Sequence, residues 1–313
     1  MNIFYSLPVI RNRWMIFLVS IVFVSVCACV SYQNAYAGNG INIKLNVGKD
    51  RFIFSDWEGP DIPVWTYVPK KGNTSNQPIA IIMHGTKRDA DRYRDEWAAL
   101  AEQYDFIVVA PQFSKAAFPK AANYNLGGVF RGKGKDKDKK LQDEGLWAFS
   151  AIEPLFTKVV DLLESNQIKY TLYGHSAGAQ FVHRFLLYKP KARVRRYIAA
   201  NAGWYTMPDF DKIYPYGLNG AEIRKSALKK ALQKDVIILL GDQDIDKTSS
   251  SLRRTPEAMK QGVNRFERGH FFFNQARERA RKLGVVFGWK LGIVRGAGHH
   301  NRQMAIVAAR LVY

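Results

Sequence analysis

Residues 170–188 read YTLYGHSAGAQFVHRFLLY. The first four residues form an apolar run typical of a buried strand, and Phe181 and Phe185 then recur at helical spacing. Between the two segments, GHSAG at 174–178 matches the pattern G-x-S-x-G. A serine on a sharp strand-to-helix turn needs small neighbours, because strand and helix approach closely while the hydroxyl stays free. We predict that Ser176 is a nucleophile on such a turn.

The same order of apolar run, turn and helical pattern recurs along the chain. Continuous apolar runs of this length favour parallel strands that are buried on both faces. We predict strands at 79–83, 106–110, 170–173, 197–200, 236–240 and 291–294, and helices at 92–104, 146–166, 177–188, 223–233 and 274–283. The alternating pattern of residues 41–69 indicates antiparallel strands. The predicted fold class is α/β, a doubly wound, mostly parallel sheet with antiparallel N-terminal strands.

The first 37 residues have the layout of a secretory signal peptide. Arg11 and Arg13 are the two charges there, an apolar run covers residues 14–30, and Ala-Tyr-Ala at 35–37 offers a cleavage site. We therefore expect a secreted or periplasmic protein with one catalytic domain over residues 38–313. Two alternatives stay open: a lipoprotein modified at Cys29, or an uncleaved membrane anchor. The other cysteine, Cys27, also lies in this segment, so the mature chain would have no disulfide.

The composition indicates a basic globular protein. Hydrophobic residues make up 47% and aromatic residues 13% of 313 residues, which is enough for a large core and too much for a disordered chain. The net charge is +20, or about +18 once Arg11 and Arg13 are removed with the signal. We expect an anionic envelope surface or an anionic substrate as partners of this charge rather than nucleic acid.

A serine hydroxyl needs a base, and the base needs a carboxylate to orient it. The run at 236–240 ends in GDQDID at 241–246, and the run at 291–294 ends in RGAGHH at 295–300. We choose Asp244 as the acid, with Asp242 second and Asp246 third, because Asp244 falls where the loop turns over the edge of the sheet. We choose His299, on a flexible glycine loop, as the base, with His300 as the alternative.

A tetrahedral intermediate needs backbone donors for its oxyanion. We predict that the amides of Ala177 and Thr86 supply them, and that His84 shapes the second loop. His183 is expected to be a packing or surface residue, and His270 is expected to be structural.

Aromatic residues in loops at the carboxyl edge suggest an acyl pocket. We name Phe113, Trp204 and Tyr205 as substrate-binding candidates, although they could equally pack the neighbouring region without touching substrate.

We expect neither a metal nor a cofactor. The aspartates at 242–246 could form a calcium loop, but Lys247 stands where such a loop needs glycine, and Arg253 where it needs glutamate.

These pieces together resemble the α/β-hydrolase superfamily, and in particular the polyhydroxybutyrate-depolymerase and feruloyl-esterase type of secreted esterase. The resemblance covers roughly residues 60–313 and lies in HGT at 84–86, GHSAG at 174–178, GDQD at 241–244 and GAGHH at 296–300. It implies cleavage of carboxylic ester bonds in a small or oligomeric substrate through an acyl-enzyme. The alternatives are a serine peptidase or amidase of the same fold, and a non-enzymatic envelope-binding protein.

One segment differs from the rest of the chain in composition. Residues 127–140 read GGVFRGKGKDKDKK and are rich in glycine and lysine. With little to bury, the segment is expected to be a mobile surface loop that is dispensable for folding. A tether for polyanions or the envelope is the functional alternative.

Overall fold

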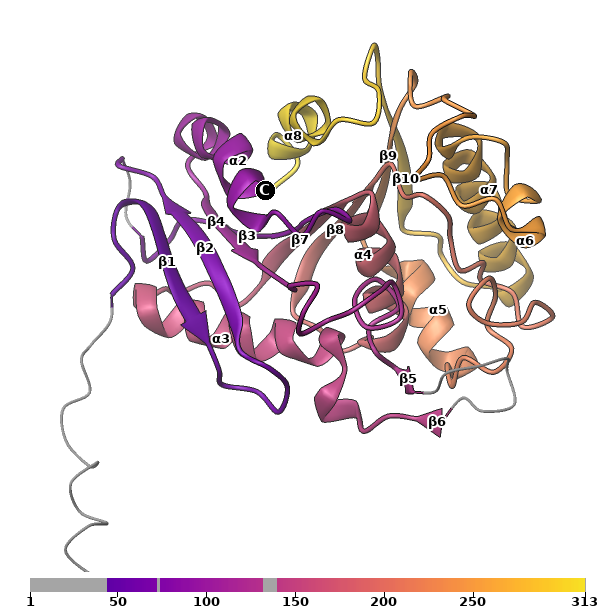
Figure 1. The fold of residues 1–313 in the computed structure, drawn as a ribbon, viewed down its shortest axis with the longest axis horizontal. Coiled ribbons are helices and arrows are strands. Elements are labelled where there is room, and N and C mark those ends of the chain that lie inside the picture. The colour runs from indigo at the N-terminus through magenta and orange to yellow at the C-terminus, as the bar shows by residue number, and fades with distance from the viewer. Residues whose placement is uncertain (1–43, 72–73, 132–139, 313) are drawn as a thin grey trace, which may run out of the picture. The chain divides into compact units, whose positions relative to one another are not determined.

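A computed structural model describes residues 44–71, 74–131 and 140–312. Their main element is a sheet of eight strands in the order β1-β2-β4-β3-β7-β8-β9-β10 (Figure 1). The strands are β1 (Gly48–Phe54), β2 (Ile62–Val68), β3 (Ile79–Met83), β4 (Ile107–Pro111), β7 (Tyr170–His175), β8 (Val194–Ala200), β9 (Val236–Gly241) and β10 (Trp289–Val294). Neighbours from β4 to β10 pair in parallel, whereas β1 with β2 and β2 with β4 pair antiparallel. The predicted fold class is confirmed.

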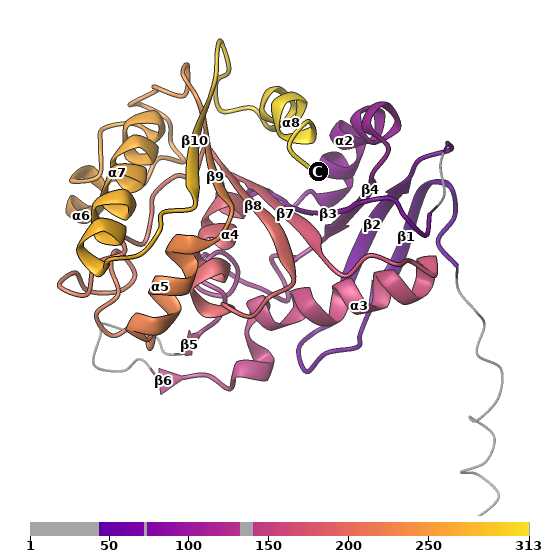
Figure 2. The same ribbon diagram turned by 180° about the vertical axis from the view of Figure 1, so that it is seen from behind.

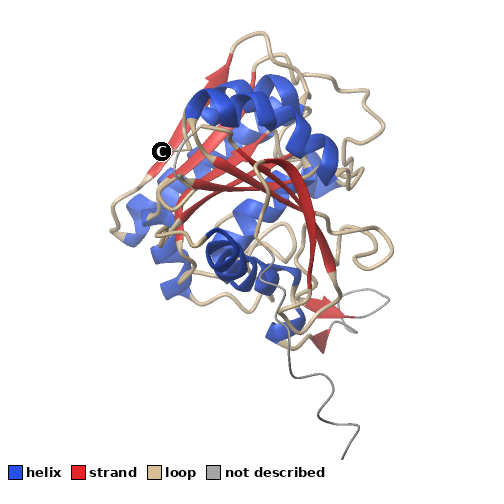
Figure 3. Cartoon of the chain, turned by 90° about the vertical axis from the view of Figure 1, so that its left-hand side faces the viewer, coloured by secondary structure: helices blue, strands red, loops and turns tan. Residues whose placement is uncertain are grey.

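Helices cover both faces of the sheet, because the central strands are apolar on both. On one face lie α2 (Ala90–Tyr104) and α8 (Asn301–Ala309), which share a core cluster with alternate residues of β3 such as Ala80 and Ile82. The intervening residues Ile79 and Ile81 pack with the opposite layer. That layer contains α3 (Ile152–Leu163), α4 (Ala177–Tyr188), α5 (Lys225–Gln233) and α7 (Arg265–Leu283). The two layers are visible from behind in Figure 2 and along the sheet in Figure 3.

Two predicted helices need correction, and two helices were not predicted. The helix predicted at 274–283 begins at Arg265, where the Asn264 side chain accepts a hydrogen bond from the Glu267 amide and caps it. The helix predicted at 146–166 is shorter, since the short 3-10 segments η2 (Glu144–Leu146) and η3 (Ala148–Ala151) precede α3. Helix α8 was not predicted. The four-residue α6 (Pro256–Met259) was also missed.

The glycine- and lysine-rich segment is partly built into the fold. Gly127 to Val129 are buried, and β5 (Phe130–Arg131) pairs with β6 (Lys140–Leu141). The expectation of a fully solvated loop is therefore wrong for the segment's beginning, because Gly127 packs directly against the Phe149 ring. Residues 132–139, and with them the lysine run, lie outside the described residues.

The predicted signal peptide, including Cys27 and Cys29, also lies outside the described residues. Within residues 44–71, 74–131 and 140–312, no helix is both long and apolar enough to cross a membrane.

Candidate active site

Ser176 sits on the sharp turn between β7 and α4, as the sequence predicted. Its backbone has φ 58° and ψ −115°, a left-handed conformation that costs an L-residue energy, and its amide donates to the Ala200 carbonyl at 3.0 Å. The flanking glycines make the turn possible. A Cβ on Gly174 would lie 2.3 Å from the Gly178 backbone, and one on Gly178 would lie 2.1 Å from the Met83 carbonyl oxygen. Any larger residue at either position would push strand and helix apart.

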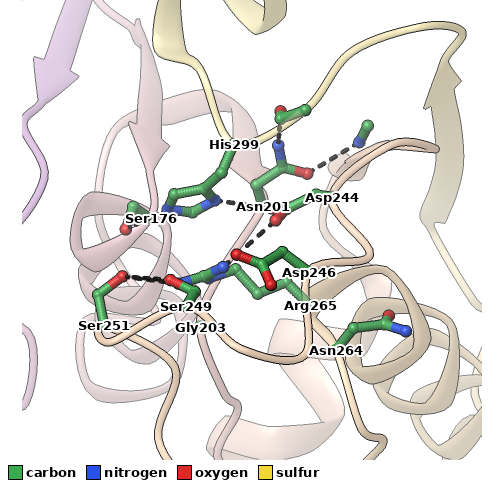
Figure 4. A network of polar contacts seen from close by, with 12 residues as sticks. Ser176, Asn201, Gly203, Asp244, Asp246, Ser249, Ser251, Asn264, Arg265 and His299 are labelled. Carbon is green, nitrogen blue, oxygen red and sulfur yellow. Dashed lines mark hydrogen bonds and ion pairs between the residues drawn. The ribbon is translucent and has the colours of Figure 1, made fainter.

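His299 joins Ser176 to Asp244, although the three residues come from three separate loops. His299 Nε2 lies 3.0 Å from Ser176 Oγ, and its Nδ1 lies 2.7 Å from Asp244 Oδ2 (Figure 4). An ionised carboxylate only accepts hydrogen bonds, so we assign Nδ1 as the donor to Asp244. In the neutral imidazole with this tautomer, the Nε2 lone pair faces the serine hydroxyl. The Asp244 carboxylate is buried, whereas the His299 side chain keeps 26% of its surface exposed. This geometry lets an imidazole take a proton from Ser176 while the carboxylate stabilises the resulting charge.

The alternative acids and base lie elsewhere. Asp242 Oδ1 accepts a hydrogen bond from the Gly296 amide at 2.8 Å, and so ties the loop of His299 to the loop of Asp244. Asp246 Oδ1 accepts from the backbone and hydroxyl of Thr248 and shapes an exposed turn. His300 is exposed at the N-cap of α8.

Asn201 is a site residue that the sequence analysis missed. It follows β8 with φ 50° and is completely buried. Its Oδ1 accepts a hydrogen bond from the Gly241 amide at 2.8 Å, and its Nδ2 donates to the Gly298 carbonyl at 3.1 Å. Asn201 thereby cross-links the end of β9 to the residue before His299. A polar residue directly after an apolar run was the signal that could have identified it.

Arg265 was also missed. It is the first residue of α7, is 2% exposed, and donates through Nη1 to Asp244 Oδ1 at 3.3 Å. This is the carboxylate oxygen that His299 does not contact. No sequence signal distinguishes Arg265 from the many other arginines of this basic chain.

His175 packs against the ring of His299. Its ring centroid lies 4.7 Å from that of His299, and its Nδ1 is 3.3 Å from the Tyr93 hydroxyl. Burial, followed by the positive electrostatic influence of His299 and Arg265, lowers the pKa of His175 well below its ordinary value. A neutral, buried ring at this position adds no competing charge beside the His299 imidazole.

The loop after β3 lies beside the serine. A Cβ on Gly85 would lie 3.8 Å from Ser176 Cβ, and Thr86 follows on the exposed side. His84 fixes this loop, since its Nε2 accepts from the Phe113 amide at 3.0 Å and its carbonyl accepts from Tyr124 Oη at 2.7 Å. Burial lowers the pKa of His84 to about 4, so the ring is neutral at physiological pH. His84 therefore has the loop-shaping contacts that were expected of it.

Ala177 is the first residue of α4. The amides in the first turn of a helix have no acceptor within the helix, so the Ala177 amide is available to an oxyanion at the turn. The candidate oxyanion donors thus come from the start of α4, directly after Ser176, and from the loop after β3, whose Gly85 lies beside Ser176.

The three substrate-binding candidates require correction. Phe113 and Tyr205 have no exposed surface, and Trp204 is 4% exposed. Phe113 packs among other aromatic rings, including Phe181 at a centroid distance of 5.6 Å. Tyr205 stacks on Phe272 at 4.4 Å. Side chains without exposed surface cannot line an acyl pocket as they stand, so the packing alternative describes them better.

Two other histidines, His183 and His270, pack against aromatic rings. His183 is buried, with its Nε2 accepting from the Thr206 amide at 3.1 Å and its ring 5.3 Å from that of Phe272. His270 lies on α7 with its ring 4.6 Å from that of Phe266. In the part of the chain that the structure describes, no cluster of three or more histidine, cysteine or acidic side chains is arranged to hold a metal ion.

Comparison with known proteins gives close matches among solved structures. No protein-family model matches the sequence, and no curated protein matches it. Poly(aspartic acid) hydrolase-1 from Sphingomonas sp. KT-1 is 42% identical with a TM-score of 0.82, over 86% of this chain and 99% of that one. The poly(3-hydroxybutyrate) depolymerase LpqC from Bordetella parapertussis is 31% identical with a TM-score of 0.79, over 85% and 89%.

A more distant match shows the fold alone. An S-formylglutathione hydrolase from Agrobacterium tumefaciens is 14% identical with a TM-score of 0.52, over 86% of this chain and 95% of that one. The two closer matches share both fold and sequence with this chain over nearly their whole length. The chain therefore belongs to the α/β-hydrolase superfamily of hydrolases, together with that poly(aspartic acid) hydrolase and LpqC.

Proposed function

We propose that this protein is a serine hydrolase that cleaves carboxylic ester bonds through an acyl-enzyme, with Ser176, His299 and Asp244 as its catalytic triad. The observation that carries the proposal is the pair of contacts of His299, 3.0 Å to Ser176 Oγ and 2.7 Å to Asp244 Oδ2. Both lengths suit the proton transfers that the mechanism requires.

Acylation begins when Ser176 Oγ attacks the acyl carbon and its proton passes to His299 Nε2. The amides of Thr86 and Ala177 stabilise the oxyanion that forms. As the tetrahedral intermediate collapses, the bond to the leaving group breaks and His299 returns the proton to that group. Water then attacks the acyl-enzyme with His299 again as the base, which releases the acid and restores Ser176.

Labelling with a fluorophosphonate tests the serine mechanism. We expect one labelled site, lost in Ser176→Ala and retained in Ser226→Ala, a matched change at an exposed serine of α5. Hydrolysis of p-nitrophenyl butyrate should follow the same pattern. Equal labelling of Ser176→Ala and the wild type would refute Ser176 as the nucleophile, whereas a wild type that is neither labelled nor active would favour the binding-protein alternative.

A second candidate is hydrolysis of amide bonds in an acidic polyamide. It is supported by 42% identity to a protein described as a poly(aspartic acid) hydrolase and by the net charge of +20. A basic surface attracts a polyanion at low ionic strength, and salt screens that attraction.

Salt dependence separates the two candidates. If an acidic polyamide is the substrate, oligo-aspartate is cleaved, and its kcat/KM falls at least tenfold between 20 and 500 mM salt, while the neutral ester responds little. Absence of oligo-aspartate cleavage would leave the ester candidate. Cleavage with equal responses of both substrates to salt would refute attraction of the polyanion by the basic surface.

Export is part of the same proposal. The charges, apolar run and Ala-Tyr-Ala of residues 1–37 support a cleaved signal. Cell fractionation should recover the enzyme outside the cytoplasm with Gly38 at its amino terminus. A membrane-bound protein that is released in Cys29→Ser would instead support the lipoprotein alternative.

A further inference from the structure

The Asp244 carboxylate is an ionised group in a place with almost no access to water. Burying a charge costs several kcal/mol unless neighbouring groups compensate it. Among the described residues, two side chains contact this carboxylate: His299 at Oδ2 and Arg265 at Oδ1. The ion pair with Arg265 is itself buried, with side-chain exposures of 2% and 1% for the arginine and the aspartate. A guanidinium stays protonated in proteins, so Arg265 supplies a permanent positive charge beside the carboxylate.

Arg265 is held in place from its other side. Its Nη2 donates to Ser251 Oγ at 2.8 Å and to Ser249 Oγ at 3.2 Å, and both serines lie on the loop that follows Asp244 (Figure 4). A guanidinium is planar, so fixing one nitrogen restricts the direction of the other. The serines therefore aim Nη1 at the carboxylate.

Another arginine already anchors the same helix. Arg268, one turn along α7, is completely buried and donates to the carbonyls of Gly203, Gly262 and Arg253. Because Arg268 connects α7 to the surrounding loops, the contact of Arg265 with the acid is not needed for that task. This division leaves Arg265 directed at the proton-transfer pathway.

We propose that Arg265 is a positioning residue that fixes the Asp244 carboxylate, so that Oδ2 stays aligned with His299 Nδ1 during proton transfer. The inference rests on the proposed serine mechanism. Arg265 donates to Oδ1, the carboxylate oxygen that His299 does not contact, and this hydrogen bond prevents the carboxylate from rotating. It also compensates the buried negative charge before the imidazolium forms. Since Arg265 is 2% exposed, it acts on the chemical step through Asp244 and not on substrate binding.

The test compares Arg265→Met, which removes the charge and both Nη donors, with Arg265→Lys, which keeps the charge. The matched control is Arg94→Met at a buried arginine of α2, whose contacts are with Asp95 and the carbonyls of Asp50 and Thr66. Rates are measured on whichever substrate the wild type cleaves, p-nitrophenyl butyrate or oligo-aspartate. They are divided by the concentration of folded protein from circular dichroism and size-exclusion chromatography.

We expect kcat of Arg265→Met to fall at least tenfold with KM within twofold of the wild type. Arg265→Lys should recover several-fold of that loss, and Arg94→Met should change stability but leave kcat within twofold. A kcat of Arg265→Met within twofold of the wild type, or a loss expressed in KM alone, would overturn the inference.

Two further variants keep the result interpretable. Should Arg265→Met fail to fold, the double variant Ser249→Ala/Ser251→Ala retains the ion pair but frees the guanidinium, and its kcat should fall several-fold at constant KM. An unchanged kcat there would count against the inference. Ser176→Ala, measured alongside, distinguishes failure of the serine mechanism from failure of the role proposed for Arg265. If it retains activity, the serine mechanism itself fails; if it is inactive while Arg265→Met is fully active, the role of Arg265 alone fails.

Discussion

Asn201 offers the sharpest test of how the site is held together, because one side chain joins two loops. Its Oδ1 and Nδ2 make hydrogen bonds of 2.8 and 3.1 Å to Gly241 and Gly298. The residue is also in the left-handed region at φ 50°, where asparagine and glycine are tolerated better than other residues. Two variants separate these contributions. Asn201→Gly removes the hydrogen bonds and keeps the backbone conformation, whereas Asn201→Ala removes the bonds and adds strain.

The magnitudes follow from burial. A buried amide or carbonyl that loses its partner costs about 1–3 kcal/mol. The Gly241 amide is buried and the Gly298 carbonyl partly so, which suggests about 2–4 kcal/mol for Asn201→Gly. A left-handed alanine adds about 1–2 kcal/mol. Because about 1 kcal/mol lowers the melting temperature of a domain of this size by roughly 2–4 °C, the two variants should differ by several degrees.

Calorimetry and steady-state kinetics measure the two consequences. We expect the melting temperature to fall in the order wild type, Asn201→Gly, Asn201→Ala. In both variants kcat should fall while the fluorophosphonate still labels Ser176, because Gly298 immediately precedes His299. The reasoning would be refuted if Asn201→Gly melted within 1 °C of the wild type with unchanged kcat. An alanine variant more stable than the glycine variant would refute the strain argument separately.

Two other predictions concern single residues. Ser176→Gly should melt at a higher temperature than Ser176→Ala although both are inactive, because glycine relieves the backbone at φ 58°; the reverse order by calorimetry would contradict this. Burial lowers the pKa of His84 from 6.5 to about 4. As pH falls, the unfolded chain therefore protonates this histidine before the folded chain does. The free energy of unfolding consequently decreases between pH 6.5 and pH 4. The loss amounts to ~3 kcal/mol, so His84→Gln should lose less stability than the wild type between pH 7 and pH 4.5 in denaturant titrations; equal losses would show that His84 does not contribute.

The sequence predicted the parallel core well because its signals are local. β3 has the predicted bounds 79–83, and α4 the bounds 177–188. The contact of Asp244 with His299 could also be predicted, since carboxyl ends of parallel strands meet at one edge and strand order brings both loops to Ser176. Helix α7 was predicted nine residues short because the aromatic residues 271–273 hide its helical spacing. Asn264 and Glu267 formed a capping signal that would have extended it.

Other parts of the site depend on contacts that sequence does not reveal. Phe113 and Tyr205 lie in loops beside the site, yet their direction is set by packing against rings from α4 and α7. Arg265 lies 21 residues from Asp244, and nothing in the spacing distinguishes a buried ion pair from a solvated arginine. Such contacts follow from tertiary packing, which sequence periodicity does not describe.

The strain at Ser176 explains why the surroundings are so heavily connected. A left-handed serine costs on the order of 1–3 kcal/mol, and the turn persists only if its neighbours exclude a relaxed alternative. Here Gly178 fits against the Met83 carbonyl, and the Ser176 amide is fixed by Ala200. Three further cross-links, from Asn201, Asp242 and Arg265, constrain the loops of the acid and the base. A hydroxyl 3.0 Å from an imidazole on another loop requires both loops to be rigid. Links that do not touch the reacting atoms therefore set the distance on which proton transfer depends.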